Sequence, residues 1–456
     1  MTTGAESPGP GSPGPDSPDP ESPGIDLEAP GPVRWICRTL EEAGFETWAV
    51  GGAVRDALAG HPSEDWDLTT RAHPKQVRRL FRRTVPIGIE HGTVGVLARD
   101  GTLYEVTTFR RDVETTGRHA VVAFADRLDD DLGRRDFTIN AVAWHPIRRS
   151  LHDPFGGSAD MRGRVLRTVG RPEERFAEDY LRILRALRFA GRFGLRVDAD
   201  TWGALCEAVP RMGNLSPERV REELDKVLAS GAGSPPSAAL SLLAASGVLG
   251  FLHPELDTPE ARGRWAAALR TVDGLPGHRL ELRLAALLSA TGSTEGAVQV
   301  LVRLRSSNRR ISEIGALAGA LATLPEGDTF LADPVARRRW MVALGRDLVP
   351  PALRLLAAWY RARTDSGAAR AGGDLLRAIR GDLHARVPLA AGELALSGRD
   401  LIQAGYRPGP AFGQVFDRLL QEVLADPARN NRDRLLERAA ELLGEGTEPT
   451  EEASDV

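Results

Sequence analysis

The amino-acid sequence predicts an α+β protein, in which a small α/β head domain is followed by an all-helical neck, body and tail. Two observations carry this prediction. Up to about residue 160, strand-like runs such as FETWAV and EDWDLTT alternate with short helical runs. Beyond that point we expect no strands. Amphipathic helical runs such as SPERVREELDKVLA follow one another there, and glycine and proline separate them.

Within the head, each element has a local signal. The helical spacing of VRWICRTLEEAG ends at Gly44, FETWAV reads as a strand, and GG turns the chain into AVRDALA, a short helix that ends at Gly60. EDWDLTT is strand-like and PKQVRRLFRR is helical. GTVGVLARDGTLYEVTTFR predicts two strands with RDG at the turn.

The composition divides the chain into five segments. Residues 1–30 repeat a pentad of the SPGPG type with eight prolines and almost nothing apolar. Such a sequence cannot bury enough apolar surface to offset the entropy of ordering, so we expect a disordered acidic tail. The head follows at 31–160, the neck at 161–250 and the helical body and tail at 251–444. A second disordered acidic tail occupies 445–456.

The charge distribution is compatible with a nucleic-acid partner. Residues 1–30 carry six acids and residues 445–456 carry five, with no base in either segment. Removing these eleven acids changes the formal net charge from −4 to +7 for residues 31–444. Lysine occurs only at Lys75 and Lys226, and arginine, which supplies the remaining positive charge, suits bidentate contacts with phosphate.

The sequence argues against a membrane protein or a secreted one. No apolar run approaches the ~20 residues that cross a bilayer, and the N-terminus lacks the basic and apolar order of a signal peptide. Cys37 and Cys206 are the only cysteines, which argues against a disulfide framework and is typical of a reducing compartment. We expect a cytoplasmic protein without a membrane partner.

Three acids predict a metal site in the head. Side chains alternate along a strand, so Asp65 and Asp67 should project from the same face while Trp66 and Leu68 face the core. Glu105, in LYEVTTF, could reach the same metals from a neighbouring strand. Oxygen ligands favour Mg²⁺, and two ions about 3.5–4 Å apart can activate an attacking hydroxyl and neutralise a leaving pyrophosphate.

Two glycines before a short helix predict a phosphate site beside these acids. Gly51 and Gly52 let a phosphate approach the backbone, and the free N–H groups at a helix start favour an anion. Arg55, three residues on, can add a charge-assisted contact. A tight strand–helix turn would also explain the glycines alone. The metal-binding pair within fifteen residues favours the phosphate site.

The motif GGAVRDALAG…EDWD resembles the signature of the nucleotidyltransferase superfamily, in its class II tRNA CCA-adding and bacterial poly(A) polymerase branch. EVTTFR, DLGRRDFTINAVAW, DPFGG, EDYLRILRALRFAGRFG and LSPERVREEL match further motifs in order, over about residues 48–228. The resemblance implies a nucleotidyltransferase-type head, a neck that recognises the nucleotide base, and a helical body and tail that bind RNA. It also implies two Mg²⁺ ions, tRNA as partner and CTP and ATP as substrates. The implied reaction adds CCA to tRNA 3′ ends and releases pyrophosphate.

The resemblance also implies roles for single residues. Asp65 and Asp67 would hold the catalytic metals, and Gly52 and Arg55 would contact the triphosphate. The rest of the nucleotide pocket would comprise Arg135 on the nucleotide, Asp136 and Asn140 on the ribose side, Asp179 and Arg182 on the base, and Arg185 and Arg188 around them.

A helical face explains how a base could be read without a template. Cytosine and adenine both present an amino donor beside a ring-nitrogen acceptor, and Asp179 and Arg182, three residues apart on one helix, match that edge. The i+3 row drifts about 60° per step, so Arg188 cannot face the same base. Arg185 and Arg188 are more suited to ribose, phosphates or structural acids.

Alternatives remain at this stage. CC-adding, A-adding and poly(A) polymerase specificities share the same motifs. A catalytically inactive RNA-binding protein on the same scaffold is a different class, and the intact Asp65–Asp67 pair and RRD motif speak against it.

Overall fold

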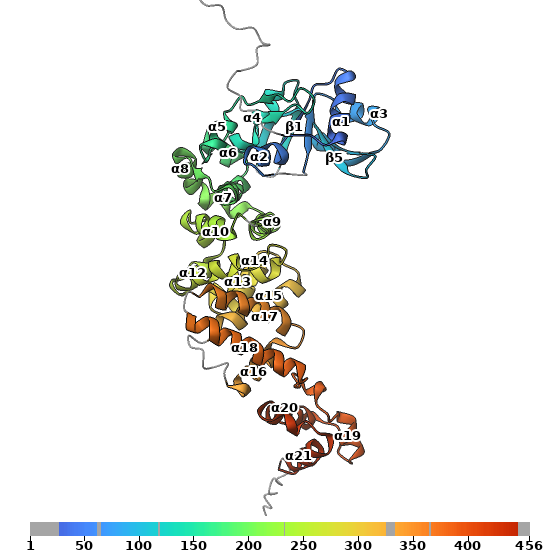
Figure 1. Ribbon diagram of the computed structural model, residues 1–456, viewed down its shortest axis with the longest axis vertical. Helices are drawn as coiled ribbons and strands as arrows, with labels where there is room; N and C mark the ends of the chain where they lie inside the picture. Colours follow the sequence, from blue (N-terminus) through green and yellow to red (C-terminus); the bar gives the residue numbers. More distant parts are fainter. Residues whose placement is uncertain are drawn as a thin grey trace, which may run out of the picture. The chain divides into compact units, whose positions relative to one another are not determined.

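The computed structural model describes residues 27–61, 65–116, 119–231, 233–324, 333–363 and 366–445 (Figure 1). They fall into two compact units: residues 1–179 with 196–201, and residues 180–195 with 202–456. The first unit holds a mixed sheet with helices and the second is helical, which confirms the predicted α+β class. Residues 1–26 and 446–456, which include most of the two predicted tails, lie outside the described residues.

The first unit is built on a seven-stranded sheet in the order β3-β4-β5-β2-β1-β8-β9. Only the β2–β5 pair is parallel among the pairs described for this sheet, with Leu68 beside Val106. A separate hairpin pairs β6 with β7. The strands are β1 Thr47–Val50, β2 Asp67–Thr70, β3 Thr84–Gly88, β4 Thr93–Leu97, β5 Leu103–Thr108, β6 Arg110–Thr116, β7 His119–Phe124, β8 Ala143–Trp144 and β9 Leu151–His152.

Alternation along the central strands separates a core face from a polar face. Trp66, Leu68 and Val106 are buried in one apolar cluster with Ile36 and Leu40 of the first helix. The neighbouring residues in β2 and β5 therefore point to the other side of the sheet. Helices in this unit are α1 Gly31–Glu42, α2 Gly52–Leu58, α3 Pro74–Leu80, α4 Leu128–Gly133, α5 Gly157–Arg162 and α6 Pro172–Glu178.

The second unit consists of helices and short 3-10 turns over its described residues. Its helices are α7 Leu181–Phe193, α8 Ala199–Ala208 (which begins in the first unit), α9 Pro217–Leu228, α10 Pro236–Ala245, α11 Val248–Leu252, α12 Pro259–Asp273, α13 Leu280–Leu288, α14 Thr294–Arg303, α15 Asn308–Ala322, α16 Pro334–Leu344, α17 Val349–Ala362, α18 Ser366–His384, α19 Gly398–Gln403, α20 Pro410–Ala425 and α21 Arg432–Glu445. No helix among the described residues is long and apolar enough to cross a membrane.

Three expectations from the sequence are wrong in detail. Strands do not end by residue 160, because β10 Val165–Leu166 pairs in parallel with β11 Arg196–Val197. The helical pattern PEERFAEDYLRILRALRFAG is not one helix, since Asp179 is extended (φ −155°, ψ 106°) and separates α6 from α7. The chain also packs before residue 30: Leu27 and Ala29 are buried in the sheet core, so the predicted tail boundary is a few residues late.

Candidate active site

The turn between β1 and α2 places two glycines against the acidic pair. Gly51 has φ 75° and ψ −130°, a conformation open essentially to glycine alone. A Cβ placed on Gly51 would lie 3.2 Å from Oδ2 of Asp67, and one placed on Gly52 would lie 3.4 Å from Oδ2 of Asp65. The residues singled out by the first motif are therefore in direct contact, and the glycines leave the space that side chains would fill.

The two aspartates lie on the polar side of the sheet as the alternation predicts. Asp65 is exposed and precedes β2, while Asp67 opens the strand and is half-buried. Because Leu68 pairs with Val106, Glu105 occupies the position beside Asp67 on β5. Asp67 and Glu105 therefore project from the same face of the sheet, opposite to Leu68 and Val106.

The electrostatics of Asp67 reflect this concentration of negative charge. Burial, with the nearby carboxylates of Asp65 and Glu105, raises the pKa of Asp67 to about 6, and the cations Arg135 and Arg55 oppose the rise. A group placed between acids that disfavour its charge and arginines that favour it is typical of a functional site.

A hydrogen-bonded network joins Arg55 to the segment that follows α4. Nη1 of Arg55 donates to Oδ1 of Asn140 at 3.1 Å, and Nε and Nη2 donate to Oδ1 of Asp56 at 2.8 and 2.6 Å. Asn140 in turn donates from Nδ2 to Oδ1 of Asp136 at 2.8 Å. Three residues that the resemblance assigns to the nucleotide thus form one buried group, although Arg55 and Asn140 are 85 residues apart in the sequence.

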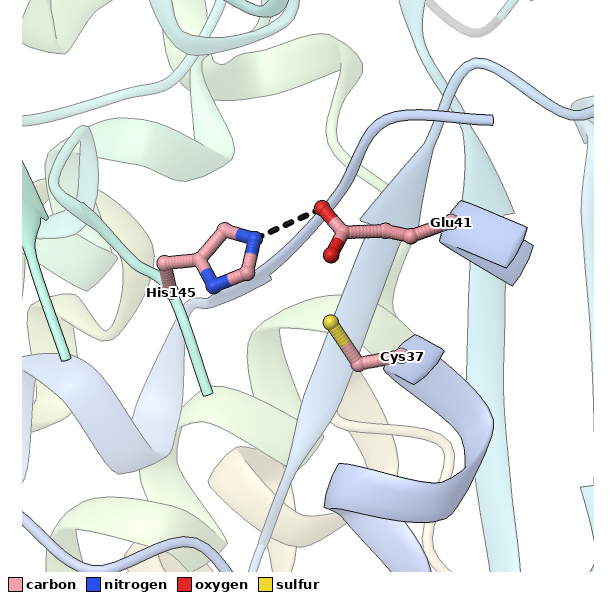
Figure 2. Close-up of side chains that lie close together, drawn as sticks. All are labelled: Cys37, Glu41 and His145. Atoms are coloured by element: carbon pink, nitrogen blue, oxygen red, sulfur yellow. Dashed lines mark hydrogen bonds and ion pairs between the residues drawn. The ribbon is translucent and has the colours of Figure 1, made fainter. Parts of the chain in front are cut away.

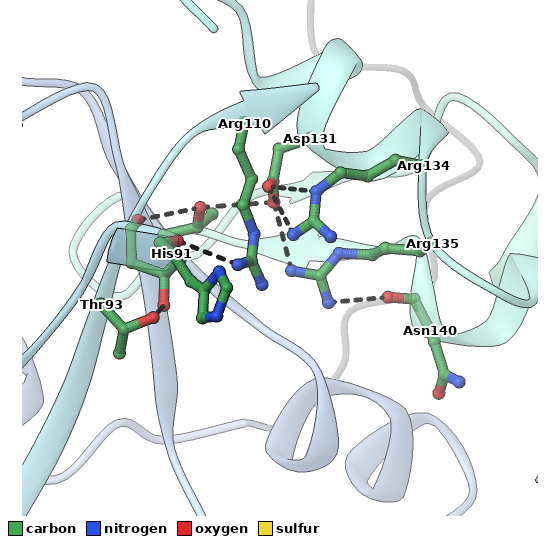
Figure 3. Close-up of polar contacts among 9 residues, drawn as sticks. His91, Thr93, Arg110, Asp131, Arg134, Arg135 and Asn140 are labelled. Atoms are coloured by element: carbon green, nitrogen blue, oxygen red, sulfur yellow. Dashed lines mark hydrogen bonds and ion pairs between the residues drawn. The ribbon is translucent and has the colours of Figure 1, made fainter. Parts of the chain in front are cut away.

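Asp131 holds Arg135 in place, and the sequence analysis missed it. Its Oδ2 accepts from Arg135 Nη2 at 3.3 Å, and its Oδ1 accepts from Arg134 at 2.9 and 3.1 Å (Figure 3). Burial alone would raise the pKa of Asp131, but the charges of Arg135 and Arg134 and their hydrogen bonds hold it below its usual value. In DLGRRD an acid in the last turn of α4 stands four residues before Arg135, which lies just beyond the helix end at Gly133, and this spacing is the signal that could have identified the pair.

Arg135 itself has capacity for a ligand. Nη1 donates to the backbone oxygen of Asn140 at 3.2 Å, and a Cβ on Gly51 would lie 3.9 Å from Nη1. Its Nε is buried and has no hydrogen-bond partner among the described residues. A buried N–H of this kind is costly unless something accepts from it. Arg135 therefore lies beside the Asp65–Asp67 pair, and its Nε–H is a donor that a ligand could use.

The residues expected to read the base do not share a helix. Asp179 lies in the break before α7, whereas Arg182 lies in the first turn of that helix, so the helical-face argument for this pair is wrong. Arg182 and Arg185 are partly exposed on α7. Arg188 is buried and donates from Nε to Oε2 of Glu223 at 2.6 Å, which is the contact with a structural acid that the drift along the helix allowed.

A second cluster of potential metal ligands is better explained as a structural contact. Cys37 and Glu41 on α1 lie close to His145 (Figure 2). Nδ1 of His145 accepts from the backbone N–H groups of Ile147 and Arg148 at 3.3 and 3.0 Å, so the proton lies on Nε2, which donates to Glu41 at 2.7 Å. A neutral imidazole that bound a metal through Nε2 would carry its proton on Nδ1. Nδ1 could then no longer accept the hydrogen bonds from Ile147 and Arg148.

The other two members of this cluster are equally unsuited to a metal. Burial, and then the charge of Glu41, raises the pKa of the Cys37 thiol to about 12, and its Sγ donates to the backbone oxygen of Thr47. Arg148 lies 3.7 Å from the Glu41 carboxylate and already balances its charge. The cluster fastens α1 to the segment after β8.

The fold and this constellation define a nucleotidyltransferase, with a mixed-sheet head and a helical remainder. Residues 47–167 match the family described as the Poly A polymerase head domain, and residues 194–258 match the probable RNA and SrmB-binding site of polymerase A. The chain belongs to the family of CCA-adding enzymes. It is 36% identical to the CCA-adding enzyme of Geobacillus kaustophilus over 404 residues, which cover 88% of this chain and 94% of the relative.

Other relatives give the same result. The CCA-adding enzyme of Lactiplantibacillus plantarum is 35% identical over 411 residues, covering 88% of this chain and 94% of the relative. The crystal structure of the Bacillus stearothermophilus CCA-adding enzyme in complex with CTP superimposes with a TM-score of 0.69 at 30% identity, covering 92% of this chain and 98% of that one. Membership of this family implies dependence on a divalent metal ion.

Proposed function

We propose that the protein is a tRNA nucleotidyltransferase that adds CCA to tRNA 3′ ends from CTP and ATP. The observation that carries the proposal is the contact between Gly51–Gly52 and the Asp65–Asp67 pair, with Arg55 and Arg135 beside it. This is a place where a triphosphate and a carboxylate-bound cation can meet. The similarity along nearly the whole chain to CCA-adding enzymes supports the choice of tRNA and of these nucleotides.

The donor set fits Mg²⁺. Asp65 and Asp67 offer hard oxygen ligands, and the raised pKa of Asp67 indicates that a cation there would relieve repulsion among the acids. We infer that Asp65 and Asp67 hold two ions, and that the carboxylate of Glu105 reaches the same ions from the neighbouring strand. When bound, the ions would lower the pKa of the attacking hydroxyl and balance charge on the leaving pyrophosphate.

The chain's own residues then bind and orient the nucleotide. The missing side chains at Gly51 and Gly52 leave room for the phosphates, and Arg55 is held toward Gly52 by Asp56 and Asn140. Arg135, fixed by Asp131, presents its buried Nε to an acceptor on the nucleotide. We assign the base contacts to Asp179 and Arg182, and places around the nucleotide to Asp136, Asn140, Arg185 and Arg188.

The experiment is single-nucleotide addition to tRNA that ends at the discriminator base. The protein is incubated with Mg²⁺ and each nucleoside triphosphate, separately and in pairs, and the products are sequenced. The proposal expects two C residues with CTP alone and a complete CCA end with CTP and ATP. Termination at CC with both nucleotides, addition of A only to tRNA ending in CC, or long A tracts would each replace CCA addition by the corresponding narrower or different activity.

A further inference from the structure

The helical unit contains an open cleft whose charged lining is entirely basic. It has a volume of about 460 Å³ and lies between the turn before α13, one face of α17, and α18. Arg279, Arg354, Arg361 and Arg380 line it with His278 and several leucines, and none of the lining residues is an aspartate or glutamate. We call these four arginines and the space between them the body cleft.

The arginines of the body cleft are exposed and lack acidic partners. Among the described residues, Arg279, Arg354 and Arg380 have neither an ion pair nor a side-chain hydrogen bond, and Arg361 donates only to the backbone oxygen of Ala357, at 3.0 Å. Four like charges around one concave surface repel one another and raise the local positive potential. An anion that entered the cleft would relieve this repulsion.

Arginines of the same unit that pack between helices differ from those of the body cleft, because they have acidic partners. Arg310 is paired with Asp225 at 2.7 Å, Arg338 with Asp382 at 3.0 Å, and Arg346 with Glu393. These arginines each contact an aspartate or glutamate, whereas the lining of the body cleft contains neither. The positive charge there is consequently available to a ligand.

The spacing of the arginines suits a chain of phosphates better than a single one. Pro350, Arg354, Ala357 and Arg361 follow one another at steps of three or four residues, so they share one face of α17. Arg354 and Arg361 are two turns apart, about 10 Å along the axis. Arg279 and Arg380 add donors from the other two walls. Arginine matches phosphate geometry with two parallel hydrogen bonds.

We propose that the body cleft binds backbone phosphates of the RNA acceptor. This inference rests on the proposed function, because it takes tRNA as the substrate. It adds a contact surface outside the matched RNA-binding segment, which ends at residue 258, whereas the body cleft begins at Leu275. Small polyphosphates carry the same anionic groups, so inorganic pyrophosphate serves as a separate probe of the cleft.

The test removes charge from the cleft and compares tRNA binding at several salt concentrations. The variant is Arg279→Gln, Arg354→Gln, Arg380→Gln, which spares the Arg361 hydrogen bond. A matched variant, Arg78→Gln, Arg79→Gln, Arg83→Gln, removes the same charge from exposed positions on the head. Dissociation constants are measured for tRNA lacking CCA, and CMP addition is measured at saturating tRNA with wild-type and variant proteins.

The cleft variant should bind tRNA at least tenfold more weakly near 0.15 M salt. Its slope of log affinity against log salt should become shallower by about 2–3, since each lost phosphate contact removes about 0.7–0.9. The rate of CMP addition at saturating tRNA and the KM for CTP should stay at wild-type values, and the head variant should bind more tightly than the cleft variant.

Equal weakening in both variants, or wild-type affinity and slope in the cleft variant, would overturn the inference. Titration with inorganic pyrophosphate distinguishes a small-anion site: loss of pyrophosphate binding in the cleft variant with unchanged tRNA binding also overturns it. In either case, the proposed function stands if the wild-type protein adds CCA to tRNA. A wild-type protein that binds tRNA but adds no nucleotide would instead sink the proposed function.

Discussion

At the scale of single residues, Asp65 and Asp67 carry the most specific expectation. Asp65→Asn and Asp67→Asn should each lower nucleotide addition by at least a thousandfold, because either change forfeits several kcal/mol of charge stabilisation at the reacting phosphate. The fold should persist, as Asp65 is exposed and Asp67 is half-buried. The measurement is CMP incorporation in Mg²⁺ with circular dichroism of each variant. Glu90→Gln, at an exposed head position, is the control, and near-normal rates in both aspartate variants would contradict the metal assignment.

His253 carries an expectation about pH. Burial, and to a lesser extent the charge of Arg303, lowers its pKa to about 4 in the folded protein, against about 6.5 in an unfolded chain. As the pH falls, the unfolded chain takes up the proton first. The contribution of His253 to the free energy of unfolding is therefore complete above pH 6.5 and is lost between pH 6.5 and 4, by about 2 kcal/mol at pH 5.

The comparison that checks this is urea unfolding of the wild type and His253→Gln at pH 7.5 and pH 5. The wild type should lose about 2 kcal/mol more than the variant between the two conditions. An equal loss in both proteins would show that His253 is not held neutral by its surroundings.

At the scale of elements, the two glycines at the start of α2 should respond differently to alanine. Gly51 has a positive φ that alanine rarely adopts, so Gly51→Ala should cost about 1–3 kcal/mol of stability and push against the Asp67 carboxylate. At Gly52, the added Cβ would make an ordinary contact with Asp65 and fill phosphate space. Gly52→Ala should melt near the wild-type temperature and raise the KM for CTP, whereas equal melting temperatures for both variants would contradict the assignment.

The break between α6 and α7 changes how base reading is to be tested. If Asp179 accepts from the amino group of cytosine or adenine, Asp179→Ala should relax selectivity against UTP and GTP. One misplaced hydrogen bond is worth about 1–3 kcal/mol, so the loss should be roughly ten- to a hundredfold. Kinetics of single additions with all four nucleotides give the answer. Equal slowing of all four would show that Asp179 only positions its neighbours.

At the scale of the whole molecule, the sequence predicted the strands and the acidic pair of the head, but it did not predict the side-chain contacts that join distant segments. Alternation around Asp67 and the glycines at turns are local, so the strands and the acidic pair could be read directly. The position of Asp131 depends on Thr69, whose Oγ1 donates to its Oδ2 at 3.3 Å from a strand 62 residues away. A pattern among neighbouring residues cannot reveal a contact between positions so far apart in the sequence. The break at Asp179 was hidden because apolar spacing continues on both sides of it, from Phe176 to Leu181.

The parallel pair of β10 and β11 has a consequence for exchanging parts between relatives. The chain leaves the first unit after Asp179 and returns at Arg196, where β11 pairs with β10 and Arg167 meets Asp198 at 3.0 Å. A chimera with one junction at residue 179 would take these partners from different parents. A chimera with additional junctions that keep residues 196–201 with the head should retain a higher melting temperature. Modularity in this protein thus follows the three-dimensional units and cannot be obtained by a single cut of the gene.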